Sequence, residues 1–153
     1  WVVIRKRFFC ETTHCPLYYI SGISEMKKKL LLVSFDAVGS DELVQLREMP
    51  NFSRIFSHGS IFPNMQTVFI SNTYPVHASI ATGVVPGKHG LICNTMLQPE
   101  NPTPWWNYDS RLFEALPIWY LAAKKGLTTG AVMMPVTAYA KNINWHDPEI
   151  FTR

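Results

Sequence analysis

Short apolar runs alternate along the chain with segments whose apolar residues recur at helical spacing. Residues 29–35 form such a run without internal alternation, which is typical of a strand buried on both faces of a parallel sheet. Residues 65–69 and 128–134 are predicted as further strands. Because strands alternate with helices, we expect an α/β fold with a largely parallel sheet and flanking helices.

Start and stop signals predict the helices between these strands. Ser40 is a suitable N-cap for the first helix, and Thr73 occupies the same position before a later one. Pro50 and Gly83 follow the apolar spacing at points where a helix should stop, and Pro117 can open the last helix. The predicted helices cover residues 40–49, 50–59, 73–82 and 118–125.

The first 25 residues lack both patterns and begin with Trp, so Met26 is the natural start of the folded part. We expect residues 1–25 to be a poorly ordered leader or extension and residues 26–153 to be the N-terminal part of a domain. Cys10, His14 and Cys15 do not have the spacing of zinc ligands.

Composition narrows the class of protein. With 153 residues, 47% apolar and 13% aromatic, the chain can bury a core without disulfides or a structural metal. A net charge of +3 is too small for a protein devoted to binding a nucleic-acid duplex, and no apolar stretch approaches the roughly 20 residues that span a bilayer. Three scattered cysteines favour a reducing compartment, so we expect a cytoplasmic location.

Asp36 and Thr73 are the candidate reactive residues. Asp36 follows the strand at residues 29–35, and ligands of open α/β sheets collect at the carboxyl ends of strands. It is either a metal ligand or a plain turn residue. Thr73 is either a simple helix cap or a hydroxyl nucleophile at an anion-binding helix N-terminus.

The other polar and aromatic candidates carry weaker signals. Nucleotide-binding glycine loops, the serine-hydrolase elbow and the C-x-x-C motif are all missing from the sequence. We interpret His77 and His89 as structural or solvated rather than as ligands. Trp105 and Trp106 can stack on a base, but two aromatic residues beside prolines more often pack a loop against the protein.

Three motifs in order resemble a known family. VSFDAVG at residues 33–39, NTYPVH at residues 72–77 and TGVVPGKHGLICN at residues 82–94 resemble the nucleotide pyrophosphatase/phosphodiesterase branch of the alkaline phosphatase superfamily. The resemblance extends over residues 27–150 and includes the segment that begins at Pro117. It implies an alkaline-phosphatase-like α/β fold, incomplete in this chain.

The resemblance also implies a catalytic site. Asp36 would bind one of two divalent metal ions, expected to be zinc, and Thr73 would be a nucleophile bound to the same ion. Attack at phosphorus would give a phospho-threonine that water then hydrolyses. Asn94 would donate a hydrogen bond to a phosphate oxygen, and Tyr74 would stack on the nucleobase. Val76 stands where the family has Asn.

The function implied is hydrolysis of phosphodiester or pyrophosphate bonds in small nucleotide substrates. The remaining metal ligands of the family would lie outside this chain, so we expect the chain alone to lack efficient activity. A non-enzymatic phosphate- or nucleotide-binding module is the alternative from another class, and a phosphomonoesterase or phosphonate hydrolase stays open within the superfamily. Sulfatases are disfavoured, because their nucleophile motif needs Cys or Ser at position 73 and Arg at position 77.

Overall fold

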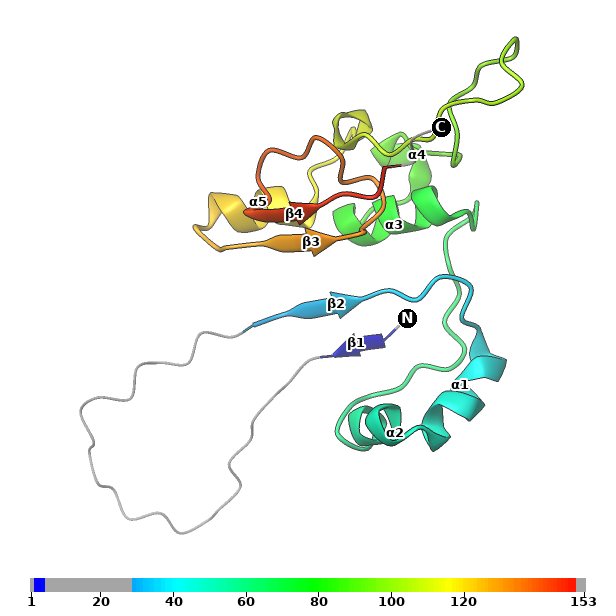
Figure 1. The fold of residues 1–153 in the computed structure, drawn as a ribbon, viewed down its shortest axis with the longest axis vertical. Coiled ribbons are helices and arrows are strands. Elements are labelled where there is room, and N and C mark those ends of the chain that lie inside the picture. Colours follow the sequence, from blue (N-terminus) through cyan, green and yellow to red (C-terminus); the bar gives the residue numbers. More distant parts are fainter. Residues whose placement is uncertain (1, 5–28, 151–153) are drawn as a thin grey trace, which may run out of the picture. The chain divides into compact units, whose positions relative to one another are not determined.

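The computed structural model describes residues 2–4 and 29–150. The chain divides into two compact units, residues 1–65 and residues 66–153, and each is described by itself. Figure 1 shows the elements of both units in chain order.

The first unit contains two strands and two helices. β1 (Val2–Ile4) pairs antiparallel with β2 (Leu31–Val33), with Val3 opposite Leu32. β2 confirms the strand predicted at residues 29–35. β1 lies within the predicted leader, and the rest of that leader, with its cysteines, lies outside the described residues.

Helices α1 (Ser40–Glu48) and α2 (Pro50–Ser57) follow, as the capping pattern predicts. Gly39, not Ser40, is the N-cap of α1, and its own N–H donates to the side chain of Glu42, the third residue of the helix, at 2.8 Å. The Phe52 ring lies between those of Phe35 and Phe56, with centroid distances of 5.9 and 6.0 Å. These rings pack α2 against the segment after β2.

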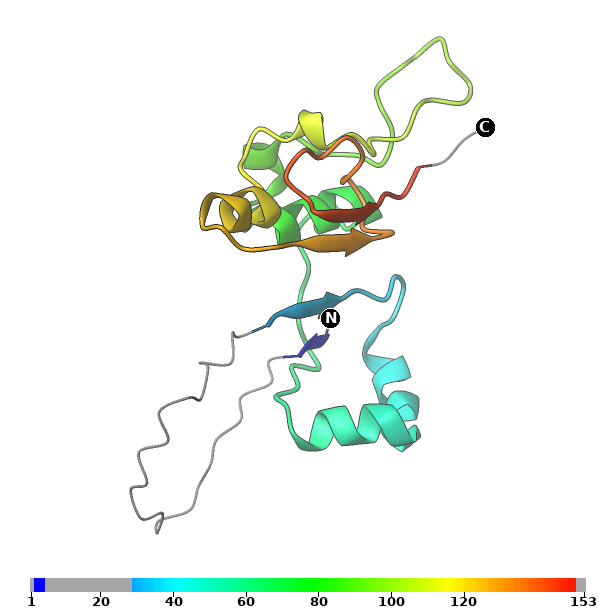
Figure 2. The same cartoon turned by 60° about the vertical axis from the view of Figure 1, so that its left-hand side comes forward.

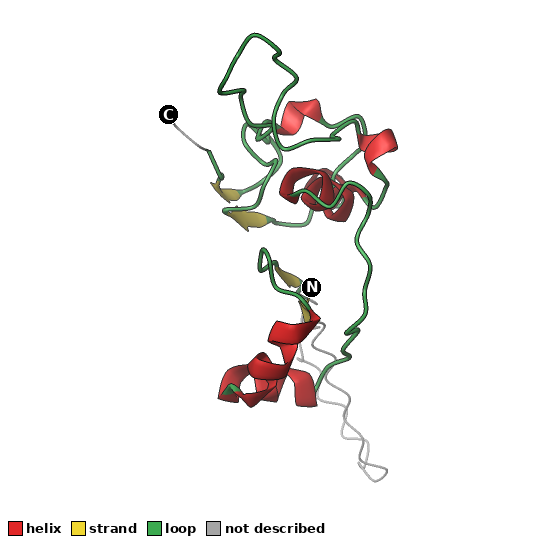
Figure 3. Ribbon diagram, turned by 90° about the vertical axis from the view of Figure 1, so that its right-hand side faces the viewer, coloured by secondary structure: helices red, strands yellow, loops and turns green. Residues whose placement is uncertain are grey.

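The second unit is built around a short parallel sheet with helices on one side. β3 (Gly130–Val132) and β4 (Trp145–Asp147) pair parallel, with Ala131 opposite His146. Figures 2 and 3 show the sheet on one side of the unit and the helices on the other. The helices are α3 (Thr73–Thr82), α4 (Pro86–His89), α5 (Ile118–Lys124) and a 3₁₀ turn, η1 (Ser110–Leu112).

The core of the second unit forms around α3. Tyr74, Ala78, Leu91 and Val136 are buried together, and partly buried aromatic and leucine side chains pack against them. Among the described residues, all the buried apolar side chains lie in this unit. Burial therefore fixes α3, the helix that carries Thr73, more firmly than any other helix described.

Two strand predictions need correction. Residues 65–69 form no strand, because they pair with no other strand among the described residues and Phe69 is 91% exposed. β4 was not predicted from the pattern, since its sequence Trp-His-Asp has no apolar run. The strand predicted at residues 128–134 is confirmed by β3, although it is shorter.

Within the described ranges, no helix is both long and apolar enough to cross a bilayer. Cys93 is exposed and carries a free thiol. The cytoplasmic location expected from the scattered cysteines stays a prediction.

Candidate functional site

Thr73 is the first helical residue of α3. The N-cap is Asn72, in extended conformation, so the cap predicted at Thr73 lies one residue earlier. Gly83 ends the helix in the left-handed conformation with φ 73°, as predicted. As the first helical residue, Thr73 is among the residues at the start of α3 whose N–H groups have no acceptor within the helix.

Asn94 supplies a partner for one of these groups. Its side-chain Oδ1 accepts a hydrogen bond from the Tyr74 backbone N–H at 2.9 Å, although 20 residues separate them. The Asn72 side chain makes no capping bond, so Asn94 acts as the cap in its place. Two of the predicted site residues, Thr73 and Asn94, are thus held at the same end of α3.

The arrangement favours a bound anion. The half-buried Thr73 stands at the positive end of a ten-residue helix whose first turn contains no acidic residue. Since Asn94 uses its oxygen for the Tyr74 N–H, its amide nitrogen is the group left to donate outward. A hydroxyl and an amide donor beside a helix N-terminus can hold and attack a phosphate group.

Tyr74 lies in the core of the unit. Its side chain is 1% exposed, its ring packs on Trp106 with a centroid distance of 5.5 Å, and its hydroxyl donates to Glu149 at 3.4 Å. Burial, and then the negative charge of Glu149, raise the pKa of Tyr74. The ring faces protein in the described chain, and its stacking on a nucleobase stays a prediction.

Glu149 was missed by the sequence reasoning. It lies two residues after β4, and its carboxylate accepts a hydrogen bond from the hydroxyl of the buried Tyr74. The hydrophobic pattern does not predict β4. The sequence therefore does not mark a polar residue after that strand as a candidate site residue.

His77 and His89 are structural, as the sequence reasoning interpreted them. The His77 ring Nδ1 lies 2.8 Å from the Thr73 carbonyl oxygen, one turn back along α3. His89 is fully buried: its Nδ1 accepts from the Leu91 N–H at 3.2 Å, and its Nε2 lies 2.9 Å from the Ser79 hydroxyl. Burial lowers the pKa of His89, so the ring is neutral and ties α4 to α3.

Asp36 follows β2 in the first unit. It is exposed, and its Oδ1 accepts from the N–H of the next residue, Ala37, at 3.1 Å. Thr73 belongs to the second unit. The role of Asp36 as a metal ligand stays a prediction.

The described residues do not by themselves fit a zinc ion. No three or more His, Cys, Asp or Glu side chains gather in residues 29–150 in a way that could hold a metal. Zinc is normally held by about four groups, and Asp36 and Thr73 would supply only two oxygens.

Comparison with known proteins places the chain in a family. The model of the "Type I phosphodiesterase / nucleotide pyrophosphatase" family matches residues 30–153. The chain belongs to this family. The match includes the segments that contain Asp36, Thr73 and Asn94, and it confirms the resemblance found in the three motifs.

Curated relatives share this stretch of sequence. The chain is 37% identical over 117 residues to ectonucleotide pyrophosphatase/phosphodiesterase family member 5 of Homo sapiens, covering 72% of the chain and 24% of the relative. It is 32% identical over 116 residues to a bis(5′-adenosyl)-triphosphatase of Xenopus laevis, and the match covers 70% of this chain and 24% of that relative. The chain thus spans about a quarter of the length of these relatives.

Solved structures agree on the fold. The murine ectonucleotide pyrophosphatase/phosphodiesterase 5 superposes with a TM-score of 0.63 at 30% identity, over 76% of this chain and 34% of that one. The same murine protein has been solved as an inactive threonine-to-alanine variant in complex with AMP. This structure superposes with a TM-score of 0.63 at 29% identity, over 76% of this chain and 33% of that one. The alkaline-phosphatase-like α/β class is confirmed over this portion.

Proposed function

We propose that the protein hydrolyses phosphodiester or pyrophosphate bonds in nucleotides, with Thr73 as the nucleophile. The hydrogen bond from the Tyr74 N–H to Asn94 carries the proposal, because it holds the Asn94 side chain at the start of α3, on the residue next to Thr73. The family of the chain supports the reaction class. The inactive threonine-to-alanine variant of the murine relative supports the choice of a threonine.

The residues of α3 have distinct roles in this proposal. The helix N-terminus attracts the phosphate, the Asn94 amide nitrogen donates to a phosphate oxygen, and the Thr73 hydroxyl attacks phosphorus. The bond from phosphorus to the leaving group breaks, and a nucleoside monophosphate stays esterified to Thr73 as a phospho-threonine that water then hydrolyses. Two divalent metal ions, expected to be zinc, belong to the proposal as well.

We further propose that dinucleoside polyphosphates are among the substrates. The relative from Xenopus laevis is named a bis(5′-adenosyl)-triphosphatase, and this chain shares 32% of its residues over the matched region. AMP, which is bound in the murine structure, is one product expected from such a substrate. Diadenosine triphosphate is therefore a natural test substrate beside simple nucleotide esters.

Hydrolysis of p-nitrophenyl thymidine 5′-monophosphate by the full-length protein tests the reaction. Thr73→Ala should lower kcat by about three orders of magnitude or more, because it removes the nucleophile, and Thr73→Ser should retain part of the activity. Thr82→Ala is a matched control, because this threonine of the same helix only donates to the Ala78 carbonyl at 2.7 Å. A chelator should abolish turnover and zinc should restore it.

Undiminished turnover by Thr73→Ala would contradict the proposed nucleophile. Turnover that resists chelation would contradict the metal dependence. Binding of AMP that is insensitive to the chelator, without hydrolysis of any nucleotide, would favour the non-enzymatic nucleotide-binding module instead.

A further inference from the structure

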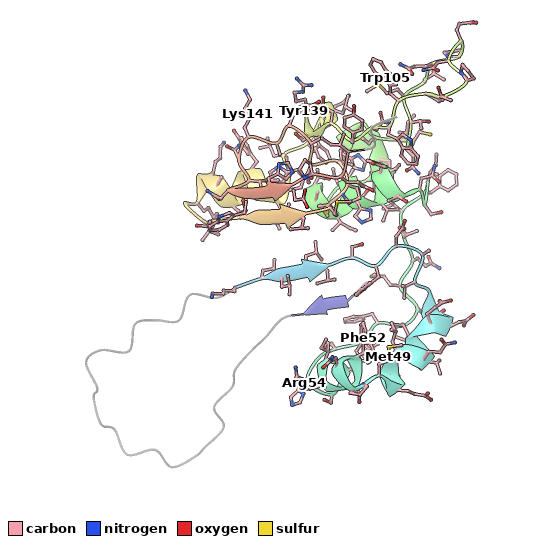
Figure 4. All side chains as sticks on the ribbon, in the orientation of Figure 1. Met49, Phe52, Arg54, Trp105, Tyr139 and Lys141 are labelled. Carbon is pink, nitrogen blue, oxygen red and sulfur yellow. The ribbon has the colours of Figure 1, made fainter. Side chains whose placement is uncertain are left out.

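A projecting arm leaves the second unit next to Asn94. Residues 95–106 form this arm, and its two ends are joined where Thr95 and Trp106 form an antiparallel bridge. The Met96 N–H donates to the Trp105 carbonyl at 2.7 Å, and the Asn107 N–H donates to the Asn94 carbonyl at 2.8 Å. Figure 4 shows Trp105 on the arm. The arm is thus anchored at the residue that caps α3.

Side-chain hydrogen bonds hold the arm in one conformation. The Gln98 Oε1 accepts from the Asn101 side chain at 2.9 Å and from the Trp105 N–H at 3.1 Å. The Asn101 Oδ1 accepts from the Thr103 N–H at 3.0 Å. These contacts fix the backbone of Trp105 before any ligand binds, which lowers the entropy cost of using its side chain in recognition.

The two adjacent tryptophans have opposite surroundings. Trp106 is half-buried and packs on Tyr74, whereas Trp105 is 62% exposed. Neighbouring side chains of an extended strand point to opposite faces, which explains the difference. The expectation that both rings pack the loop down is met by Trp106 and is wrong for Trp105. A large aromatic ring on a rigid, solvent-facing arm is available to bind a ligand.

We propose that Trp105 stacks on the second nucleobase of a dinucleoside polyphosphate. The proposal rests on the function proposed above, in which Thr73 attacks the phosphate next to the first nucleoside. The arm begins directly after Asn94, which in that proposal holds the phosphate, so it is the segment next to the phosphate site that can meet a second nucleoside. Stacking suits a neutral base, and Glu100 is the one charged residue of the arm.

Comparing the hydrolysis of diadenosine triphosphate with that of ATP separates the effect of this contact from an effect on catalysis. Both present an AMP group to the site, but ATP lacks a second nucleoside. For Trp105→Ala, kcat/KM should fall about tenfold more for diadenosine triphosphate than for ATP, which is the usual effect of removing one stacking partner. The loss should appear mainly in KM, and Trp105→Phe should restore most of it because it keeps an aromatic face.

Leu97→Ala is the matched control. Leu97 is 94% exposed on the same arm and offers no flat ring, so its removal should leave the ratio of the two kcat/KM values unchanged. An unchanged ratio in Trp105→Ala, or an equal change in Leu97→Ala, would overturn the stacking role while ATP hydrolysis by the unsubstituted protein still supports the proposed function. If that protein hydrolyses neither substrate, the proposed function fails, and the stacking role fails with it.

Discussion

Asn94 holds the start of α3, and we propose that it also binds phosphate there. Its oxygen accepts the Tyr74 N–H at 2.9 Å, and its amide nitrogen is the donor assigned to the phosphate. One side chain therefore connects the stability of the helix end to the chemistry at Thr73. Different substitutions at this single position can separate the two effects.

Asn94→Asp should keep the stability and lose the activity. A carboxylate still accepts the Tyr74 N–H, but it has no donor for phosphate and repels the substrate's charge. Asn94→Ala should lose the activity and also about 1 kcal/mol of unfolding free energy, because the Tyr74 N–H loses its partner. Denaturant unfolding and steady-state kinetics on both variants measure these effects. Equal stability loss in the two variants would contradict the capping role.

Sequence patterns predict some of these residue roles and not others. A threonine before a helix and an aspartate after a strand stand out in the sequence, and the motif resemblance adds Asn94 and Tyr74. The hydrogen bond between Asn94 and Tyr74 spans 20 residues, and only the fold brings these two residues together. Glu149 has no sequence signal because its importance comes from its contact with the buried Tyr74 hydroxyl.

The helices of the chain are fixed by local signals. Proline stands at the start of α2 and before α5, and glycine follows α3. These residues determine the backbone dihedral angles at the helix ends, independently of the rest of the protein. For this reason the predicted helix bounds are correct to within about two residues.

Strands depend on distant partners instead. β3 and β4 pair parallel although more than ten residues separate them, and the short polar β4 becomes a strand only through this pairing. Residues 65–69 have the apolar composition of a strand and form none among the described residues. Composition alone therefore predicts β4 and residues 65–69 wrongly.

Substitution of Gly83 tests how strongly the stability of the end of α3 depends on the left-handed backbone conformation at this residue. Gly83→Ala should lower the unfolding free energy by about 1 kcal/mol, because a Cβ is unfavourable at φ 73° although nothing lies within 4 Å of it. Gly87→Ala in α4 is the matched control: its Cβ also meets nothing within 4 Å, and its φ is not positive, so it should not destabilise. Equal losses in both variants would contradict the conformational explanation.

The two units differ in how their apolar side chains are buried. The second unit buries Tyr74, Val136 and Trp119 among others, whereas α1 and α2 of the first unit contain no buried residue. The candidate nucleophile thus stands on the better-packed unit, together with Asn94 and the arm. Well-packed surroundings benefit an active site, because a reacting group must be held in position within a fraction of an ångström.

At the scale of the whole molecule, family membership is established and the chemistry is proposed. The family match covers residues 30–153, and the fold agrees with the murine relative at a TM-score of 0.63. Sequence motifs identify this family without a structure, since several short strings in the right order are specific. The placement of Thr73, Asn94 and the arm in the same unit comes from the structure.

A covalent intermediate on Thr73 tests the central claim most directly. The full-length protein is mixed with a nucleotide ester, quenched with acid within the first turnover, digested and analysed by mass spectrometry. We expect a nucleoside monophosphate on the peptide that contains Thr73, and none in Thr73→Ala. Rapid turnover with an unmodified Thr73 peptide, or a covalent adduct on another residue, would contradict Thr73 as the nucleophile.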